Sequence, residues 1–369
     1  MGNCRSYNSI YEQYQRTELL IGLKPNSKLP ELNAILQCLC HIEPIINYFR
    51  YKYKEIEKIN SYQRHKKNGK CLAQALKHLI YKLYPDKDLR EKTTYTKTAS
   101  SEEFLEMIYK IDPKYNNNTT PLIEFIQKNL HNELNKVSNT ILDYYHKIDK
   151  GDKANVFKNF SKSFIKENQS IISDYFFGVY YKYSTYYCGH KEYEFGFYSF
   201  DLFDLSQVKM FMVLNLPMTM QVSINSPLII SLNECLFYKK RPSINYENCK
   251  KHCQTFQCSH CIINYFPPRI LCYVFTNAPN NTRFLIEEYF NINAYIEIPT
   301  KSNYELIGLI YICYPNLYIA YCKNPVNKMW YCYDNDKVKS VDIHDIKMTY
   351  NVPYMLFYQL EEPIKNKYN

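Results

Sequence analysis

The sequence predicts an α+β fold in which helices come first and strands follow. Apolar residues spaced for one face of a helix recur through the first 170 residues. After residue 172 the apolar segments become short, aromatic and β-branched, and Asn, Pro and Asp separate them, which is typical of strands and turns. Tyr is unusually abundant, with 39 residues, and this also favours a large sheet.

The expected helices share apolar residues at intervals of three and four, and Pro residues end or interrupt them. Ser100 and Glu103 have the spacing of a capping box, so Ser100 is expected to be an N-cap. The expected helices are residues 32–50 (interrupted at Pro44), residues 71–83, a segment from about residue 100 to the residue before Pro113, and segments near 120–146 and 153–167.

The expected strands are short runs of aromatic and β-branched residues. They are Phe176 to Tyr187, Val208 to Leu214, Ile270 to Phe275, Leu317 to Cys322 and Trp330 to Asp334. Residues 277–282 are expected to form a loop, because they combine Asn, Pro and Thr.

The composition excludes several function classes. Apolar residues make up 46% and charged residues 22%, so a folded core is expected, and the eight Gly residues never take the spacing of a dinucleotide or Walker phosphate loop. The longest apolar stretch, Leu306 to Tyr314, is too short to span a membrane, and no apolar secretory signal opens the chain. The 14 Cys therefore indicate a reducing, cytoplasmic compartment. Scattered basic residues give the net charge of +10, which predicts a solvated surface and no nucleic-acid partner.

The first six residues match the motif for N-terminal myristoylation. Gly2 is the acceptor position and Ser6 stands at the required offset. One myristoyl chain holds a protein to a membrane only marginally, and Cys4 offers a palmitoylation site as a second signal. We therefore expect residues 1–20 to be a flexible segment that attaches the protein to the cytoplasmic face of a membrane. The alternative is a terminus that matches the motif by chance.

Several short motifs occur in a fixed order along the chain. They are Gly22-Leu23-Lys24, Leu32-Asn33-Ala34-Ile35-Leu36-Gln37-Cys38-Leu39, Glu103-Phe104-Leu105, Phe266-Pro267-Pro268-Arg269-Ile270-Leu271, residues 318–323, residues 330–338 and residues 354–358. Over about residues 20–360 this ordered set closely resembles the papain-like ubiquitin-specific proteases. The resemblance implies a hand-like fold, with a helical thumb (about 21–170), β-rich fingers (about 171–265) and a β palm (about 266–362), followed by a tail of residues 363–369.

The resemblance also assigns the positions of a catalytic site, and most of them have changed. In that family the nucleophilic Cys stands three residues before the Asn that is Asn33 here, and this position holds Pro30. The oxyanion donor, an Asn five residues before the nucleophile, falls on Pro25, and the general base falls on Leu317. Only the acid that orients the base matches, as Asp334, which without an imidazole is also explained as a polar turn residue.

These replacements remove the chemistry. Proline has neither a thiol nor a backbone N–H for an oxyanion, and leucine cannot transfer a proton. Asn26 could restore an oxyanion donor after a one-residue loop adjustment. A substitute nucleophile among Cys38 and Cys40 beside His41, or near His344, is the remaining route to an active site.

The family's fingers often hold a structural zinc with two C-x-x-C pairs, and this chain retains them only in part. The first pair falls on Cys188 and Lys191, with His190 as a conceivable stand-in for the second thiolate. The second region contains Cys249, Cys253, Cys258 and Cys261, of which the last two have knuckle spacing. Cys is common throughout the chain, so thiols without metal are the alternative.

The resemblance therefore implies a non-catalytic pseudo-deubiquitinase that binds ubiquitin or a ubiquitinated protein and acts as a scaffold. No cofactor is required for this function, and a structural zinc is optional. The alternative is an active thiol-dependent deubiquitinase that hydrolyses ubiquitin isopeptide bonds, and a third reading is a structural subunit without affinity for ubiquitin.

Overall fold

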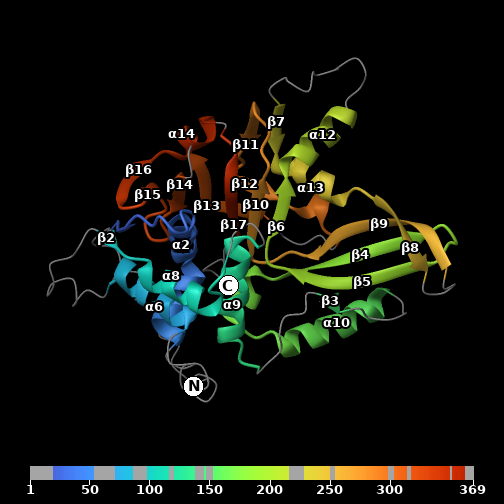
Figure 1. Cartoon of the computed structure of the whole chain (residues 1–369), viewed down its shortest axis with the longest axis horizontal. Coiled ribbons are helices and arrows are strands. Elements are labelled where there is room, and N and C mark those ends of the chain that lie inside the picture. The colour runs from blue at the N-terminus through green and yellow to red at the C-terminus, as the bar shows by residue number, and fades with distance from the viewer. Residues whose placement is uncertain are drawn as a thin grey trace, which may run out of the picture. The chain divides into compact units, whose positions relative to one another are not determined.

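The computed structural model describes most of the chain (Figure 1). The described residues are 20–53, 71–85, 98–115, 120–137, 145–146, 153–215, 228–249, 254–297, 303–313, 317–349 and 351–361. The chain divides into two compact units, one formed by Met1–Leu122 with Ile307–Thr349, and the other by Ile123–Leu306 with Tyr350–Asn369. The three-way division into thumb, fingers and palm stays a prediction.

The first unit contains an antiparallel sheet made from the last part of the chain. In it β14 (Leu317–Lys323) pairs with the end of β13 (Asn303–Cys313) on one side and with β15 (Trp330–Asp334) on the other. β16 (Lys337–Val341) forms the edge, and its turn from β15 places Asn335 at a φ of 53°, a conformation that Asn tolerates better than most residues. The short helix α14 (Ile343–Met348) follows this edge strand.

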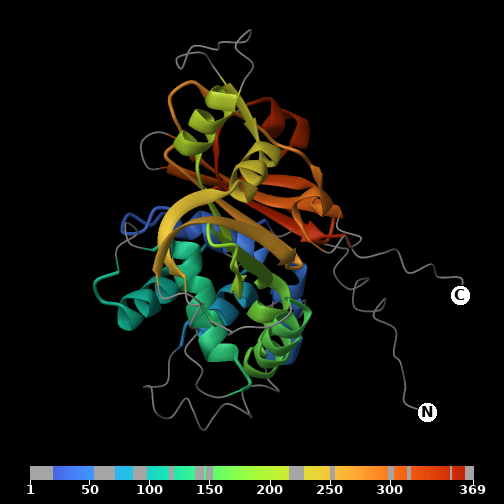
Figure 2. The ribbon, with the colours of Figure 1, turned by 90° about the vertical axis from the view of Figure 1, so that its right-hand side faces the viewer.

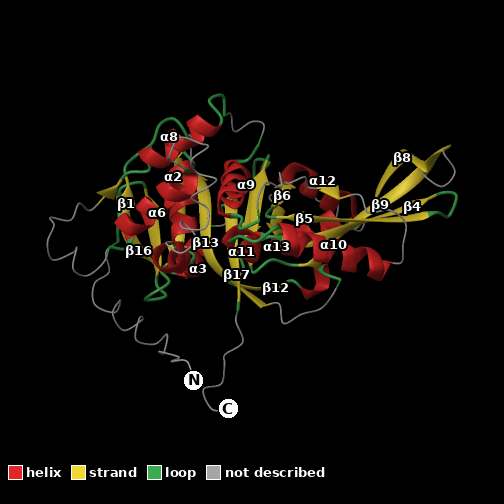
Figure 3. Cartoon of the chain, turned by 90° about the horizontal axis from the view of Figure 1, so that it is seen from below, coloured by secondary structure: helices red, strands yellow, loops and turns green. Residues whose placement is uncertain are grey.

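Five helices from the start of the chain belong to the same unit, and the first of them packs against this sheet (Figure 3). α2 packs on β14 and β15, and α6 packs on α8. They are α2 (Leu32–Cys40), α3 (Glu43–Asn47), the π-helix η1 (Tyr48–Lys52), α6 (Leu72–Leu83) and α8 (Glu102–Ile111). A two-stranded parallel pair, β1 (Gly22–Leu23) and β2 (Thr98–Ala99), runs beside them.

The side chain of Asn33 on α2 links four segments of this unit. It is 4% exposed, and its Nδ2 donates to Lys24 O (2.7 Å) and to Asn335 Oδ1 (2.9 Å). Its Oδ1 accepts from Ser101 Oγ at 2.6 Å, just before α8. Gly22 packs directly against the same β15–β16 turn, because a Cβ there would lie 2.5 Å from Asn335 O.

The second unit contains two main groups of paired strands. In one, β10 (Ile270–Thr276) lies between β17 (Pro353–Leu360), which is antiparallel, and β6 (Asp201–Asp204), which is parallel. Further elements of this unit are β7 (Leu228–Ser231) paired with β11 (Thr282–Leu285), β12 (Tyr289–Asn291) paired with the first residues of β13, the helices α9 (Leu122–Leu134), α11 (Ile171–Phe176), α12 (Leu205–Asn215) and α13 (Leu232–Lys240), and the 3-10 turn η3 (Asn293–Tyr295).

The other sheet has the strand order β3-β5-β4-β9-β8 and is antiparallel throughout. Its long strands β8 and β9 curve together (Figure 2). The helix α10 (Lys153–Glu167) packs on β5, where Phe160 and Phe195 stack. The strands are β3 (Tyr145–His146), β4 (Gly178–Tyr186), β5 (Lys191–Tyr198), β8 (Ser243–Cys249) and β9 (Gln254–Phe266).

Most of the expected elements are confirmed, and three are wrong. Val208 to Leu214 is part of the helix α12, where Asp204 Oδ1 accepts from the N–H groups of Ser206 and Gln207 as a helix cap does. The expected capping box does not form: Ser100 Oγ accepts from Glu102 N–H at 3.2 Å, but Glu103 contacts His78 and does not reach back to Ser100. The N-cap of α8 is Ser101, whose hydroxyl bonds Asn33. The helix near 120–146 ends at Leu134, and residues 145–146 form β3. Within the described residues, no helix has the length and apolar character to cross a membrane.

We predict that Asn33→Ala lowers the free energy of unfolding by about 2–4 kcal/mol, because it leaves buried hydrogen-bonding groups of three partner segments unsatisfied. Asn33→Asp should be worse, since a carboxylate would face the two acceptor oxygens of Lys24 and Asn335. Urea unfolding measures both, with the exposed Ser27→Ala as control. An Asn33→Ala protein as stable as the control would contradict the linking role of this side chain.

Candidate functional site

The positions that the resemblance assigns to catalysis all lie in the first unit, around the start of α2. Pro30 is half-buried and stands two residues before the first residue of α2, where a missing N–H costs the helix no hydrogen bond. The turn is closed instead by Leu32 N–H, which donates to Leu29 O at 3.0 Å. The proline therefore fits the local structure well.

Leu317 and Asp334 lie on neighbouring strands that α2 covers. Leu317 opens β14, is half-buried, and pairs with Cys313 across the β13–β14 ladder. Next to it, Tyr318 is half-buried, and its pKa is raised by burial and by the negative charge of Glu31. The start of α2 and the start of β14 are thus close in space, which is the arrangement that a nucleophile and its base would need.

The thiols around these strands are not activated. Burial raises the pKa of Cys313, and the nearby Asp334 carboxylate raises it further. Burial also raises the pKa values of Cys332, Cys322 and Cys40. A nucleophilic cysteine needs the opposite shift, because the thiolate is the reactive form.

The alternative pair of Cys38 or Cys40 with His41 is excluded by the contacts of the imidazole. His41 Nδ1 donates to Gln37 O at 2.7 Å, so Nε2 is the acceptor for the hydroxyl of Tyr333 at 2.8 Å. Burial lowers the pKa of His41 to about 4, which keeps the ring neutral. Cys38 Sγ lies instead 3.7 Å from Cys322 Sγ. His41 therefore joins α2 to β15 and has no lone pair left for a thiol.

His344 and Asn26 were the other candidates for lost functions. His344 is exposed on α14, where its N–H is held by Asp342 Oδ1 at 2.7 Å. Pro25 is exposed, and Asn26 Oδ1 accepts from Lys28 N–H at 2.9 Å. The buried Nδ2 of Asn26 has no hydrogen-bond acceptor among the described residues. An amide donor is thus present beside the position that the resemblance assigns to the oxyanion donor, but the pKa values of the nearby Cys313 and Cys332 thiols are raised.

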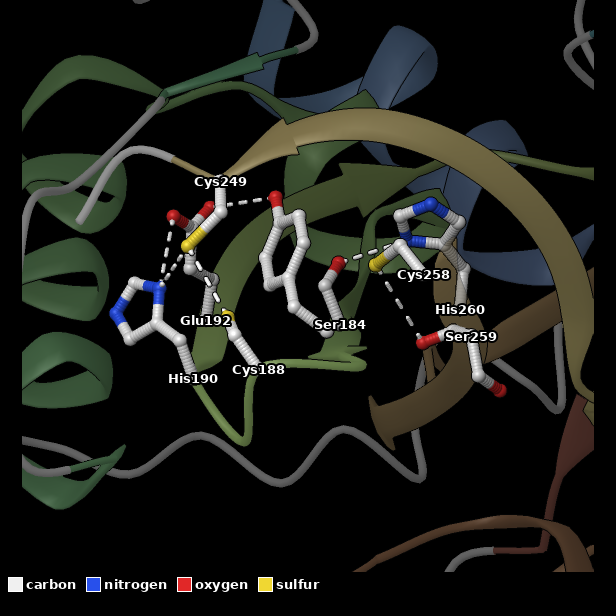
Figure 4. A network of polar contacts seen from close by, with 9 residues as sticks. Ser184, Cys188, His190, Glu192, Cys249, Cys258, Ser259 and His260 are labelled. Atoms are coloured by element: carbon white, nitrogen blue, oxygen red, sulfur yellow. Dashed lines mark hydrogen bonds and ion pairs between the residues drawn. The ribbon is translucent and has the colours of Figure 1, made fainter. Parts of the chain in front are cut away.

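The cysteines assigned to the fingers lie in the second unit, at one end of the five-stranded sheet (Figure 4). Cys188 and His190 stand in the turn between β4 and β5, which Gly189 makes with a φ of 79°. Cys249 ends β8, and its Sγ lies 3.6 Å from Cys188 Sγ and 3.2 Å from His190 Nδ1. Glu192 follows on β5, with Oε1 3.7 Å from His190 Nδ1.

Cys258 and Cys261 do not form the expected zinc knuckle. They lie three residues apart on the continuous strand β9, so their side chains point to opposite faces of the sheet. Cys258 packs with Cys249 and Tyr186, whereas Cys261 Sγ donates to Lys240 O at 3.1 Å. Knuckle spacing needs a turn between the two thiols, and a strand supplies none. Cys253 lies outside the described residues.

The described residues alone do not complete a zinc site. Two thiolates on one tetrahedral zinc stand about 3.7 Å apart, because each Zn–S bond is about 2.3 Å. The Cys188–Cys249 distance of 3.6 Å fits this value. Yet no group of three or more His, Cys, Asp or Glu side chains in the described part of the chain is arranged to hold a metal ion.

Two polar features of these regions were not anticipated from the sequence. Glu31, 3% exposed, places a carboxylate directly after the nucleophile position. On the finger sheet, His260 Nδ1 bonds Ser184 Oγ at 2.8 Å, and its Nε2 lies 2.9 Å from Glu247 Oε1. The alternation of side chains along β4, β8 and β9 determines which residues share a face of the sheet. It shows which of them meet only when the register between the strands is also known. Gly2 and Cys4 lie outside the described residues.

Comparisons with known proteins agree with this architecture. Residues 31–358 match the family model of ubiquitin carboxyl-terminal hydrolases. The fold is similar to that of a chain in a structure of the yeast SAGA deubiquitinating module carrying a mutant Sgf73, with a TM-score of 0.62 and 17% identity over 95% of this chain and 70% of that chain. It is also similar to a chain in the module of Ubp8, Sgf11, Sus1 and Sgf73 bound to monoubiquitin, with a TM-score of 0.58 and 17% identity over 93% of this chain and 70% of that one.

The sequence match and the α+β fold lead to the same assignment, which the ordered motifs from Gly22 to Tyr358 had indicated. This chain belongs to the ubiquitin carboxyl-terminal hydrolase family.

Proposed function

We propose that this protein is a non-catalytic member of its family that binds ubiquitin or ubiquitinated proteins and acts as a scaffold. The observation that carries the proposal is the occupancy of two positions: Pro30 where the nucleophile belongs and Leu317 where the base belongs. Both sit in well-formed local structure beside the Asn33 contacts. The structure around the two positions is therefore kept without the reactive groups.

We expect a chain that lacks both the nucleophile and the base to have almost no hydrolytic activity. In a serine protease with a comparable triad, loss of the nucleophile or the base alone lowers kcat by about six orders of magnitude. No described thiol near the site replaces the nucleophile, because the pKa values of Cys313 and Cys332 are raised. What remains available to this fold is binding.

Ubiquitin is the proposed ligand because a chain of similar fold belongs to a module that has been determined with monoubiquitin bound. A binding-only role requires a stable surface and no chemistry, which matches the described site. The competing function is an active deubiquitinase that uses a thiol outside the described residues.

We predict that a ubiquitin probe with an electrophilic C-terminus forms no covalent adduct with the natural chain, while unmodified ubiquitin binds in a titration by calorimetry. A Pro30→Cys, Leu317→His variant is the matched control, because adduct formation there shows that the probe reaches the site. Adduct formation by the natural chain would establish the active enzyme. Absence of binding to ubiquitin in the titration would leave only the structural subunit.

We further propose that Cys188, Cys249 and Cys253, with His190, hold a structural zinc. This zinc would join the β4–β5 turn to the end of β8. The distances from Cys249 Sγ to Cys188 Sγ and His190 Nδ1 support three of these ligands, and the spacing of Cys249 and Cys253 supports the fourth. Cys258 and Cys261 are left out because β9 separates them.

The predicted metal content is one zinc for each chain, measured by atomic emission after gel filtration. Cys188→Ser and Cys253→Ser should each lose the metal and lower the melting temperature, because the zinc links separate hairpins. Cys261→Ser is the control and should keep its zinc. A natural chain purified without zinc after growth in zinc-supplemented medium would contradict the proposal.

The myristoylation motif leads us to propose attachment to the cytoplasmic face of a membrane through acyl groups on Gly2 and Cys4. We predict that Gly2→Ala moves the protein from the membrane to the soluble fraction of cells, since both acyl groups depend on the first. Ser6→Thr, which keeps the motif, should leave the distribution unchanged. An unchanged distribution of Gly2→Ala would remove the proposal.

A further inference from the structure

The second unit exposes an apolar patch on two neighbouring helices. On α12, Met210 and Leu214 stand one turn apart and are 59% and 76% exposed. On α13, Phe237 is 61% exposed and its ring lies 5.9 Å from that of the half-buried Phe211. Met210, Phe211, Leu214 and Phe237 are called the α12–α13 patch below. Contiguous exposed apolar groups of this kind mark interaction surfaces.

The rim of the patch carries exposed positive charge. Arg241 follows α13, lies 5.5 Å above the ring of Phe211 and donates to Tyr238 Oη at 2.7 Å. Lys240 beside it is also exposed, and its Nζ donates to Ala294 O at 3.2 Å. The acidic groups of these helices are engaged within the fold: Asp204 accepts from Ser206 and Asn277, and Glu234 caps α13 through Ser231.

The sequence around the patch has the same character. Residues 210–233 contain no Asp, Glu, Lys, Arg or His, which makes this the longest stretch of the chain without a titratable or charged residue of these types. α12 exposes Ser206 and Gln207 in its first turn, but the five residues from Met210 to Leu214 are all apolar, and two of them are exposed. An apolar surface with Met, Leu and Phe, bordered by Lys and Arg, has the composition that binds an anionic lipid interface.

We propose that the α12–α13 patch docks onto an anionic membrane surface, inserting Met210, Leu214 and Phe237 between lipid headgroups while Lys240 and Arg241 face the phosphates. The occupant is a lipid surface because apolar and cationic groups lie together and because the chain opens with an acylation motif. A single myristoyl chain needs a second contact for stable attachment. The patch supplies that contact from the folded domain, whether or not Cys4 is acylated.

The test uses the full-length chain without acyl groups and with Phe237→Trp as a reporter. The natural Trp330 is 5% exposed in the other unit and gives a constant background. Vesicles of phosphatidylcholine and phosphatidylserine in equal amounts should shift the emission of Trp at position 237 to the blue and sediment with the protein. Vesicles of phosphatidylcholine alone should bind less, and salt should weaken the binding.

Two sets of variants separate the apolar and the electrostatic contributions. Met210→Gln with Leu214→Gln should reduce the vesicle-bound fraction at least about tenfold, and Arg241→Gln should lower affinity roughly fivefold for the anionic vesicles. The matched control is Met329→Gln with Met348→Gln, which changes similarly exposed residues (51% and 53%) of the first unit and should bind as the parent does.

The proposal is overturned if the parent chain binds neither vesicle, or if the control pair lowers binding as much as the patch pair. It is also overturned if the parent dimerises in sedimentation velocity, loses this with Met210→Gln and Leu214→Gln, and ignores vesicles, because the patch then serves a second copy. Since the chain is not acylated here, these outcomes do not depend on Gly2 or on ubiquitin binding.

Discussion

The carboxamide of Asn33 is the constraint on which the candidate site depends. Its three hydrogen bonds join α2 to the segment after β1, to the start of α8 and to the β15–β16 turn, which is 302 residues away in sequence. Pro30 precedes α2 and Asp334 ends β15, and these two elements are joined by His41, while Leu317 opens the neighbouring strand β14. Because these contacts are buried and do not involve the reactive positions, the frame can persist after the chemistry is lost.

The residues that replace the family's nucleophile and base are ones that the local structure tolerates. A proline before α2 leaves no donor unsatisfied, since the first N–H groups of a helix have no partner within it. A leucine at the start of β14 adds apolar contact where a histidine would need hydrogen bonds, and burial favours it. Asp334 has meanwhile become a neighbour of Cys313, where its charge opposes thiolate formation. Selection for folding alone could thus retain this arrangement without retaining an enzyme.

The sequence predicted the fold class, most of the helices in the first 170 residues and four of the strands, because periodic burial is a local signal. It also placed Pro30, Leu317 and Asp334 through the resemblance, though not Glu31 beside Tyr318. Predictions from the sequence were wrong where a side chain contacts a residue that is distant along the chain. Glu103 contacts His78 and does not complete a capping box with Ser100, and Cys258 and Cys261 lie on opposite faces of β9. Spacing alone cannot show whether a strand or a turn lies between two thiols.

The error at Val208 to Leu214 has a physical cause that bears on function. Short apolar segments show too little of a 3.6-residue period to be told from strands. Between Val208 and Leu214 the one polar residue, Lys209, is buried, whereas the apolar Met210 and Leu214 are exposed. The exposed apolar residues that hid the helix from the sequence pattern are therefore the ones on which the proposed lipid contact rests. When the apolar residues of a segment contact a lipid surface and not the protein core, their spacing does not reveal whether the segment is a helix or a strand.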